Sequence, residues 1–400
     1  MSNLLTGGDL RARDHHRIED DAREEGPLHP VTLPNGVRMQ VVTVGLELTR
    51  QLLADQRLSK DSAKLQREIK RQLAERGSAQ ENLAGLFGPS MLNSDNPQHA
   101  RLRALAVKAF NGKAVQQLAP RIEEISAELI GGLPENEEID LVKELTVPVP
   151  MHVIGEVLGL PAQDRAHVRR LIETMMSMEP EVSQPASDEL GGYFHGLLSG
   201  NGLDPRSLFG VLATAADDDG DRLSHDELMA MAFLLVVAGH ETSAGLIANV
   251  VHDALDNGLW HEVAEDPGLV PRLVEETLRH NPPVRSATHR IATEPVEIAG
   301  TTVAENTLLL INLGSAGRCP RAHEKAGEYR LDRATTGHAT FGHGPHFCLG
   351  SALARLETET VLRQLTSRFP RTVHAGEGKP EVTHSDIMAS LKSLPVVLRR

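Results

Sequence analysis

One helical pattern, over residues 224–258, is longer than any other in the chain. Apolar residues recur there with helical spacing. Ser224 and Glu227 have the spacing of a capping box at its start, and Asn257 with Gly258 provides a stop signal at its end. At about 1.5 Å per residue such a helix would span roughly 50 Å. The pattern therefore predicts one helix that crosses a whole domain.

Polar residues interrupt the middle of this pattern, with the sequence Gly239-His240-Glu241-Thr242-Ser243. Glycine inside a helix costs about 0.5–1 kcal/mol, and a buried polar side chain without a partner costs about 1–3 kcal/mol. Two interpretations remain open: a solvated stripe of the helix, or a local opening of the helix where a ligand sits. A zinc-protease motif is excluded, because residue 244 is alanine rather than a second histidine.

The remaining hydrophobic pattern predicts more helices and a few short strands. Helical spacing recurs over residues 47–72 with a break at 53–61, and over 98–110, 114–131, 148–158 and 163–178, with a short helix from Pro271. A β-rich stretch, residues 31–44, surrounds Asn35-Gly36, which is a strong hairpin signal. Residues 286–310 and 382–400 also have β-like runs. The expected fold class is mainly α with small β-sheets (α+β).

Three stretches lack a clear periodicity. Residues 1–29 are polar and charge-dense, and we expect a loosely ordered N-terminal arm. Residues 77–96 are rich in Gly, Ser, Asn and Pro and predict a long loop. Residues 179–188 carry prolines and acids and predict a break between two helices, which is either a mobile lid or an ordinary connector.

Composition narrows the class of protein. A formal net charge of −14 over 400 residues argues against nucleic acid or an anionic membrane as the main partner. The two cysteines exclude a disulfide framework and fit a reducing compartment. We find neither an N-terminal apolar segment nor a run of about 18 apolar residues, so we expect a soluble cytoplasmic protein.

Candidate chemistry lies in residues 341–350, Phe-Gly-His-Gly-Pro-His-Phe-Cys-Leu-Gly, directly before a helical pattern over 351–369. A glycine-rich loop can turn its backbone N–H groups toward one atom, here the sulfur of Cys348. The start of the following helix would lower the pKa of the thiol and favour the thiolate, which binds soft metals. The loop therefore predicts a metal–thiolate bond, with a buried structural cysteine as the alternative.

Four features in a fixed order define a resemblance. They are the helix start His99 to Arg103, the stretch Ala238-Gly239-His240-Glu241-Thr242, the stretch Glu276-Thr277-Leu278-Arg279, and the Cys348 loop. Together they resemble the bacterial soluble cytochrome P450 family, the haem-thiolate monooxygenases, over residues 31–400. The loop is highly specific, whereas the other motifs gain weight from their order and spacing.

The resemblance implies a triangular prism around a buried haem b, in a single domain of residues 30–400. It implies monooxygenation, by hydroxylation or epoxidation, of an apolar small molecule with O2. Electrons would come from NAD(P)H through a ferredoxin reductase and a ferredoxin, and the protein would be a monomer. Basic residues are mostly arginine, which suggests a GC-rich genome. Secondary-metabolite biosynthesis, including that of antibiotics, or xenobiotic oxidation is the expected context.

The resemblance also assigns residues around the haem. Cys348 would be the proximal iron ligand, Phe341 would shield its side, and Gly350 would contact the cofactor. The residues that would pair with the haem propionates are His99, Arg103, Arg290 and His346.

On the distal side, Gly239 and Thr242 would form the oxygen-binding groove, with Ala238 near the substrate. Thr242 would hydrogen-bond to oxygen, and Glu241 would connect it to solvent as a proton source. Glu276 and Arg279 would be a structural ion pair, completed by Arg333. The resemblance places the substrate pocket at residues 77–93 and 179–188, and at Ala238, Val284, Ser286, Ala287, Ile387 and Met388.

Some positions depart from the family pattern. Cys319 stands where an aspartate is common and is a candidate oxidation-prone thiol, and Tyr329 stands where phenylalanine is common. A basic patch for an acidic ferredoxin would use Arg101, Lys108, Lys113 and Arg355.

Two alternatives remain. One alternative is the same fold using hydrogen peroxide directly, but that class usually replaces the acid–threonine pair, which is intact here as Glu241 and Thr242. A non-catalytic metal-binding protein would instead hold zinc with His343, His346 and Cys348, and Cys319 is available as a fourth ligand.

Overall fold

A computed structural model describes residues 10–33, 35–75, 90–110, 112–175, 180–199, 203–205, 207–214, 220, 222–333, 337–376, 380–384 and 387–400. The α-helices are α1 (Ala12–Glu25), α2 (Leu46–Ala54), α3 (Ser62–Ala74), α4 (Gln98–Ala109), α5 (Gly112–Gln117), α6 (Ala119–Gly131), α7 (Pro148–Leu158), α8 (Arg165–Met175), α9 (Pro180–Ser199), α10 (Leu208–Thr214), α11 (His225–Asp256), α12 (Trp260–Glu265), α13 (Val270–His280), α14 (Leu313–Gly317) and α15 (Ser351–Arg368). Short 3-10 turns lie at Met91–Asn93, Ala162–Asp164, Pro267–Leu269 and Gly344–His346, and a π-helical turn lies at Val142–Thr146.

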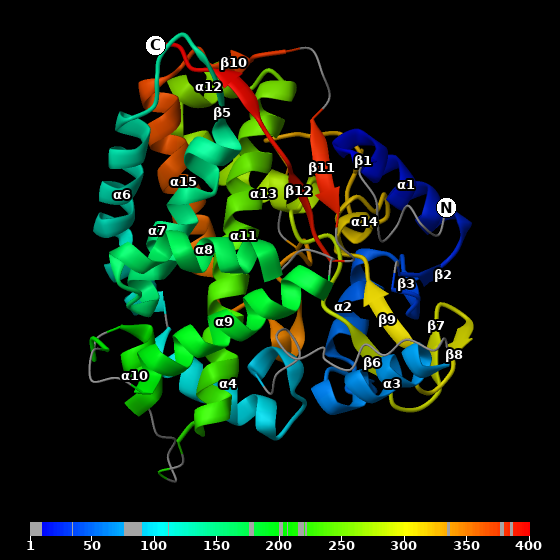
Figure 1. Cartoon of the computed structure of the whole chain (residues 1–400). Coiled ribbons are helices and arrows are strands. Elements are labelled where there is room, and N and C mark those ends of the chain that lie inside the picture. The colour runs from blue at the N-terminus through cyan, green and yellow to red at the C-terminus, as the bar shows by residue number, and fades with distance from the viewer. Residues whose placement is uncertain are drawn as a thin grey trace.

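The strands form small sheets. They are β1 (Leu10–Arg11), β2 (Leu28–Thr32), β3 (Arg38–Val42), β4 (Leu58–Ser59), β5 (Glu138–Asp140), β6 (Arg290–Ala292), β7 (Val296–Ile298), β8 (Thr301–Val303), β9 (Leu308–Ile311), β10 (Val373–His374), β11 (Glu381–His384), β12 (Ala389–Leu391) and β13 (Pro395–Val397). Within the described residues the largest sheet has the order β2-β3-β9-β6-β4, and the others are β1-β11-β12, β10-β13-β5 and β7-β8. The largest sheet lies to one side of the molecule and most of the helices to the other (Figure 1).

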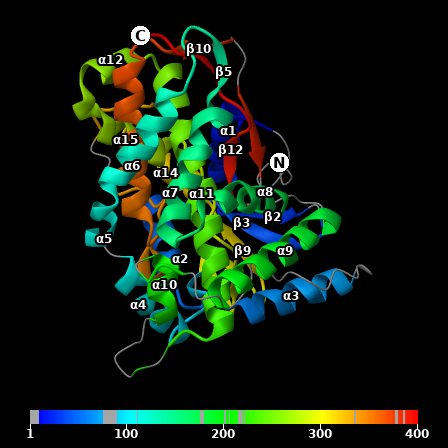
Figure 2. The same ribbon diagram turned by 60° about the vertical axis from the view of Figure 1, so that its left-hand side comes forward.

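Helix α11 runs through the middle of the molecule in both views (Figures 1 and 2). Its capping box forms as predicted, because the Ser224 hydroxyl accepts from the Glu227 backbone and the Glu227 carboxylate accepts from the Ser224 backbone. Helices α7, α13 and α15 pack against α11. The prediction of one long helix is confirmed, but the helix is continuous over its 32 residues, so the local opening is not seen.

Helix α11 is also long and apolar enough to span a membrane by length and composition, with a mean hydropathy of 1.5 in its best window. Half of that window is buried inside the protein. The core helix of a soluble protein meets the same criteria, so this is weak support for a membrane span. An uninterrupted run of 18 apolar residues is not present, because Gly239-His240-Glu241-Thr242-Ser243 lies in the middle of the helix.

The hairpin predicted around Asn35-Gly36 forms as β2 and β3, which pair antiparallel with Val31 opposite Met39. Strand β9 joins β3 in parallel, and β6 pairs with β9 antiparallel. Apolar side chains fill both faces of this sheet. Leu65 and Ile69 of α3 pack in one cluster, and Leu52 of α2 packs in the other.

The expected break at residues 179–188 is wrong for the part that the structure describes. Residues 180–199 form helix α9, and Pro185 lies inside it. Ala186, Leu190 and Phe194 recur at four-residue spacing and are all buried. Helix α9 packs closely along α8. Burial of this apolar stripe therefore outweighs the hydrogen bond that Pro185 cannot donate.

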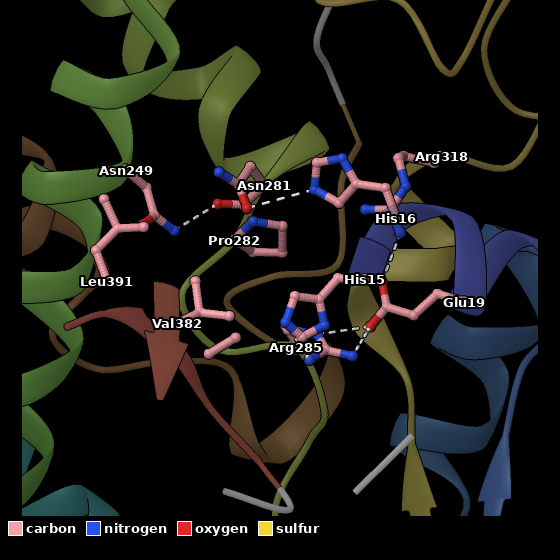
Figure 3. Close-up of a pocket in the computed structure, with 11 residues that line it drawn as sticks. His15, His16, Glu19, Asn249, Asn281, Pro282, Arg285, Arg318, Val382 and Leu391 are labelled. Carbon is pink, nitrogen blue, oxygen red and sulfur yellow. Dashed lines mark hydrogen bonds and ion pairs between the residues drawn. The ribbon is translucent and has the colours of Figure 1, made fainter. Parts of the chain in front are cut away.

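The loosely ordered arm expected over residues 1–29 is also corrected within its described part. Residues 12–25 form helix α1, in which Ile18 and Ala22 are buried. The buried Glu19 carboxylate forms ion pairs with Arg285 at 2.6 Å and Arg318 at 2.5 Å (Figure 3). Burial alone would raise the pKa of Glu19, but the two arginines outweigh it and lower the pKa to about 2. Arg285 and Arg318 lie 266 and 299 residues further along the chain, and they hold this polar helix in place.

The structure also accommodates the two departures from the family pattern. Cys319 is 3% exposed and lies against Gly45, so the expectation of an oxidation-prone thiol is not supported. The Tyr329 hydroxyl donates to the Leu273 carbonyl at 3.1 Å and lies 2.7 Å from the Thr277 hydroxyl. A tyrosine therefore adds hydrogen bonds where phenylalanine would only pack.

Candidate active site

The loop of residues 341–350 is closed by its own backbone. The Cys348 N–H donates to the Phe341 carbonyl at 2.8 Å. Gly342 and Gly344 have φ of 78° and 71°, which side-chain-bearing residues rarely adopt. A Cβ on Gly344 would also lie 3.1 Å from that of Ala54 in α2. The glycines thus allow a tight loop that ends at the start of α15.

Cys348 is a free cysteine at the end of this loop, and part of the residue is exposed. The protein around the sulfur removes water from it, and this burial raises the pKa of the thiol. Hydrogen bonds from the Gly350 and Ser351 backbone N–H groups, and the charge of Arg103, act in the opposite direction without reversing it. The expected lowering of the pKa is therefore wrong for the protein alone, although the backbone donors do point at the sulfur as predicted.

The structure brings His99, Arg103, Arg290 and His346, the donor cluster, together beside the loop. The rings of His99 and His346 are 4.0 Å apart between centroids. Burial, with the charges of Lys60, His99, Arg290 and Arg103, lowers the pKa of His346 to about 2. Arg103 donates to the Phe347 carbonyl at 2.8 Å. The cluster therefore holds neutral imidazoles and arginine cations close together.

Two buried nitrogens of this cluster have no hydrogen-bond partner within the described residues. They are Nε of Arg290, which is a donor, and Nε2 of His99, which is a donor in the tautomer that carries its hydrogen there. The rest of the Arg290 guanidinium donates to the Leu53 and Leu58 carbonyls, at 3.0 and 3.1 Å. Unpaired buried donors are costly, so they indicate a ligand with acceptor groups. A cofactor with two carboxylates and a metal that takes the Cys348 sulfur fits both observations.

Lys60 belongs to the same region, and the sequence analysis missed it. It follows strand β4, is 3% exposed, and hydrogen-bonds through Nζ to the Thr288 hydroxyl. Its charge acts on the pKa of both His99 and His346. The sequence around Lys60 contains no local signal that distinguishes a buried lysine from a solvent-exposed one.

On helix α11, the Thr242 hydroxyl donates to the Ala238 carbonyl at 2.6 Å. Ala238 itself is exposed. A Cβ on Gly239 would lie 2.7 Å from Cδ1 of Ile154, so close packing of α7 requires this glycine. The structure thus gives Gly239 a packing role that the sequence analysis did not consider.

Two carboxylic acids lie on or beside this part of α11. Burial, and then the charge of Glu173 on α8, raises the pKa of Glu241 to about 7. Glu357 of α15 is 1% exposed, and burial raises its pKa to about 8, although a hydrogen bond with Ser243 lowers it. The sequence analysis missed Glu357, because an acid within an amphipathic helix normally faces solvent.

The segments expected to line the substrate pocket are partly brought together. Val284 and Met388 form an antiparallel β-bridge, and the Ser286 N–H donates to the Ile387 carbonyl at 3.1 Å. The neighbouring Pro283 lies against α11, because a Cβ on Gly245 would be 2.9 Å from its Cβ. Ala287 donates its N–H to Ile311. Residues 77–89 lie outside the described residues.

Glu276 and Arg279 are both fully buried, and they form a two-point ion pair at 2.7 and 2.8 Å. Arg333 approaches the same carboxylate at 3.3 Å. The Arg279 guanidinium also donates to the carbonyls of Gly317, Ala326 and Glu328. The pair therefore fastens α13 to the segment that leads to the Cys348 loop.

The proposed basic patch is weakened by the structure. Arg101 pairs with Glu227 at 2.8 Å. Arg355 pairs with Glu275 at 2.5 Å, and its guanidinium carbon lies 4.5 Å from the Phe341 ring centroid. The side chain of Lys108 lies outside the described residues. Two of the candidate cations are therefore neutralised by carboxylates of the chain itself.

The zinc alternative also loses support. Over the residues that the structure describes, no group of three or more His, Cys, Asp or Glu side chains is placed to hold a metal ion. His343 is exposed, whereas Cys319, the suggested fourth ligand, is buried against Gly45. The expected ligands are therefore not gathered around one point.

Comparison with known proteins identifies the class. The model of the Cytochrome P450 family matches residues 267–399. Cytochrome P450 107B1 of Saccharopolyspora erythraea is 37% identical over 99% of this chain and 98% of its own length. The cytochrome P450 monooxygenase PikC of Streptomyces venezuelae is 36% identical over 94% of this chain and 89% of its own. The chain belongs to the cytochrome P450 family.

A solved structure of the P450 monooxygenase TamI, bound to tirandamycin C, has a TM-score of 0.87 at 33% identity, covering 96% of this chain and 98% of that one. The cytochrome P450 fold expected from the sequence is therefore confirmed. The chain is a haem-thiolate monooxygenase, an oxidoreductase that uses haem iron and O2. Bacterial members of this family generally use redox partners and hydrophobic substrates.

Proposed function

We propose that this monooxygenase binds haem b with Cys348 as the iron ligand and with the donor cluster around the propionates. The unpaired buried donors of His99 and Arg290, next to the Cys348 loop, carry this assignment. Bound haem supplies activation of O2 at a thiolate-ligated iron. A metal-bound thiol is deprotonated outright, so coordination overcomes the raised pKa of the free thiol.

The proximal residues tune that thiolate. The Gly350 and Ser351 N–H groups hydrogen-bond to the sulfur and temper its electron donation. Phe341, which packs against the Arg355 guanidinium, would shield the same side. Absorption spectroscopy of the purified protein, reduced with dithionite and exposed to carbon monoxide, tests the assignment. A strongly red-shifted Soret band supports it, and no Soret band after haem reconstitution would refute it.

On the distal side, Thr242 and Glu241 hold and move protons. The Thr242 hydroxyl donates to Ala238, which leaves its oxygen lone pairs free to accept a hydrogen bond from the other side. With a pKa of about 7, Glu241 is partly protonated at neutral pH and can deliver a proton. Glu357, on the α15 side, is a second buried acid that keeps its proton near neutral pH.

Thr242→Ala is expected to leave the carbon monoxide spectrum unchanged while diverting electrons to hydrogen peroxide. Product formed per NAD(P)H should fall at least about tenfold, because positioned proton-transfer groups contribute roughly 10²–10⁴-fold. Thr242→Ser keeps the hydroxyl and should retain most of the coupling. An unchanged product-to-NAD(P)H ratio in Thr242→Ala would show that the hydroxyl has no such role.

The pH dependence of coupling is expected to follow Glu241. Its pKa in the folded protein is raised to about 7, so the acid form prevails below pH 7 and is lost as the pH rises through 7. Product per NAD(P)H should therefore decline between about pH 6 and pH 8. Glu241→Gln should be low and pH-independent, and Glu173→Gln should move the decline to lower pH by removing a repulsive charge. The same decline in Glu241→Gln would contradict the assignment.

For the substrate, we infer an apolar small molecule of the secondary-metabolite class. The similar protein TamI has been solved with tirandamycin C bound, which supports this class of substrate. The β-bridged Val284 and Met388, and the exposed Ala238 on α11, would supply apolar lining. Electrons from NAD(P)H through a ferredoxin reductase and a ferredoxin, in the cytoplasm, complete the proposal. Turnover with NAD(P)H and these partners, but not with peroxide alone, distinguishes it from a peroxide-using enzyme.

A further inference from the structure

Lys60 is a buried lysine that the mechanism above does not use. Its side chain is 3% exposed, and Nζ hydrogen-bonds to the Thr288 hydroxyl. Its backbone N–H donates to Asp95 Oδ1 at 2.9 Å, which fixes the chain at the end of β4. The lysine is thus held in place at its backbone, while its ammonium lies in the interior.

No carboxylate of the described residues forms an ion pair with this ammonium. The nearest acid in its electrostatic surroundings is Asp95, which instead accepts from the Ser59 hydroxyl at 2.5 Å and pairs with Lys64 at 3.6 Å. Burial, and then the charge of Arg290, lowers the pKa of Lys60 well below the usual value, and Asp95 offsets this only in part. The ammonium therefore has no ion-pair partner within the described chain.

A buried cation without an ion-pair partner is among the costliest groups in a protein. Lys60 nevertheless lies beside other donor groups. Strand β4, which ends at Ser59, pairs with β6, and the Arg290 guanidinium at the start of β6 donates to the Leu58 carbonyl at 3.1 Å. Nε2 of His99 and Nε of Arg290 are buried without a hydrogen-bond partner among the described residues. These groups keep N–H donors that no described acceptor satisfies, which indicates that an anionic ligand completes the region.

We propose that Lys60 binds a carboxylate of the cofactor, as a fifth member of the donor cluster. The proposal rests on the haem site proposed above. The Thr288 hydroxyl, which accepts from Nζ, orients the ammonium and leaves its other two N–H groups for the carboxylate. Lys60 thereby adds an ammonium donor next to the Arg290 guanidinium, to which β4 is already hydrogen-bonded.

Lys60→Met tests the proposal in the holoenzyme, because methionine keeps the length of the side chain without the charge. We expect haem to transfer to apomyoglobin about 10–100-fold faster, as befits loss of a charged hydrogen bond. We also expect a lower haem reduction potential, since a nearby cation favours the electron-rich ferrous state. Lys60→Arg should restore both, and Lys60→Gln provides a further charge-free variant if the methionine variant does not accumulate.

Lys64→Met is the matched control. It makes the same substitution four residues later, at a side chain that is 45% exposed and paired with Asp95. Haem transfer and potential should stay at the unmodified values. Equal transfer rates and potentials for Lys60→Met, Lys60→Gln and Lys64→Met would overturn the proposal and leave Lys60 a packing residue. Absence of a thiolate-type carbon monoxide band in the unmodified protein would instead refute the haem assignment itself.

Discussion

Replacing Cys348 with serine is expected to abolish the red-shifted carbon monoxide band and to reduce turnover to background. A serine hydroxyl is a poor ligand for haem iron, and it does not supply the electron donation that favours O–O cleavage. The Gly350 and Ser351 N–H groups would remain in place, so the loop should keep its shape. The measurement is the dithionite-reduced carbon monoxide difference spectrum together with product formation.

Cys319→Ser is the matched control, because it makes the same substitution at the other cysteine. Cys319 is buried against Gly45, away from the donor cluster, and its replacement should preserve the band. A band that survives in Cys348→Ser, or that disappears in Cys319→Ser, would refute Cys348 as the ligand. A Soret band at the histidine-ligated position in the unmodified protein would mean that the loop binds haem without a thiolate.

Replacing Glu276 with glutamine is expected to lower the free energy of unfolding by about 3–5 kcal/mol, the cost of breaking a buried ion pair. Both Glu276 and Arg279 are 0% exposed, and Arg333 approaches the same carboxylate. The substitution leaves these cations without a counter-charge in the interior. Because proteins are stable by only about 5–15 kcal/mol, we also expect poor haem retention.

Urea unfolding of the holoenzyme measures this effect, with Glu265→Gln as the control. Glu265 also pairs with a neighbour on its own helix, His261, but its side chain is 71% exposed. Exposed pairs contribute little, so the control should change the free energy of unfolding by less than about 1 kcal/mol. If the two variants unfolded at the same urea concentration, the buried pair would not stabilise the fold as argued.

Elements with a strong local signal were predictable from the sequence. The capping box at Ser224 fixes the start of α11, and Asn35-Gly36 fixes the hairpin of β2 and β3. Two elements were mispredicted because distant residues stabilise them. Helix α1 depends on ion pairs of Glu19 with Arg285 and Arg318, and Pro185 is tolerated because α9 packs along α8. Composition alone gives no sign of such partners.

In the candidate site, too, residues within distinctive motifs were predictable and residues whose burial depends on the fold were not. Motif order placed Cys348 and Thr242 on the right elements, since each lies in a stretch with a distinctive pattern. Lys60 and Glu357 were missed, because burial of a charged side chain is a property of the folded chain. The direction of the Cys348 pKa was wrong for the same reason, as burial outweighs the backbone donors.

The anchoring of α1 also fixes the extended segment that carries Val284, Arg285 and Ser286. Arg285 lies between Val284 and Ser286, whose backbone joins residues 387 and 388. Successive side chains of an extended segment point to opposite sides. Glu19 therefore holds the segment through the side chain of Arg285, while the side chains of Val284 and Ser286 point to the other side. Helix α1 therefore supports the segment that we propose as one wall of the substrate pocket. A change at residue 19 is therefore expected to shift the proposed pocket segment without altering any side chain that would touch the substrate.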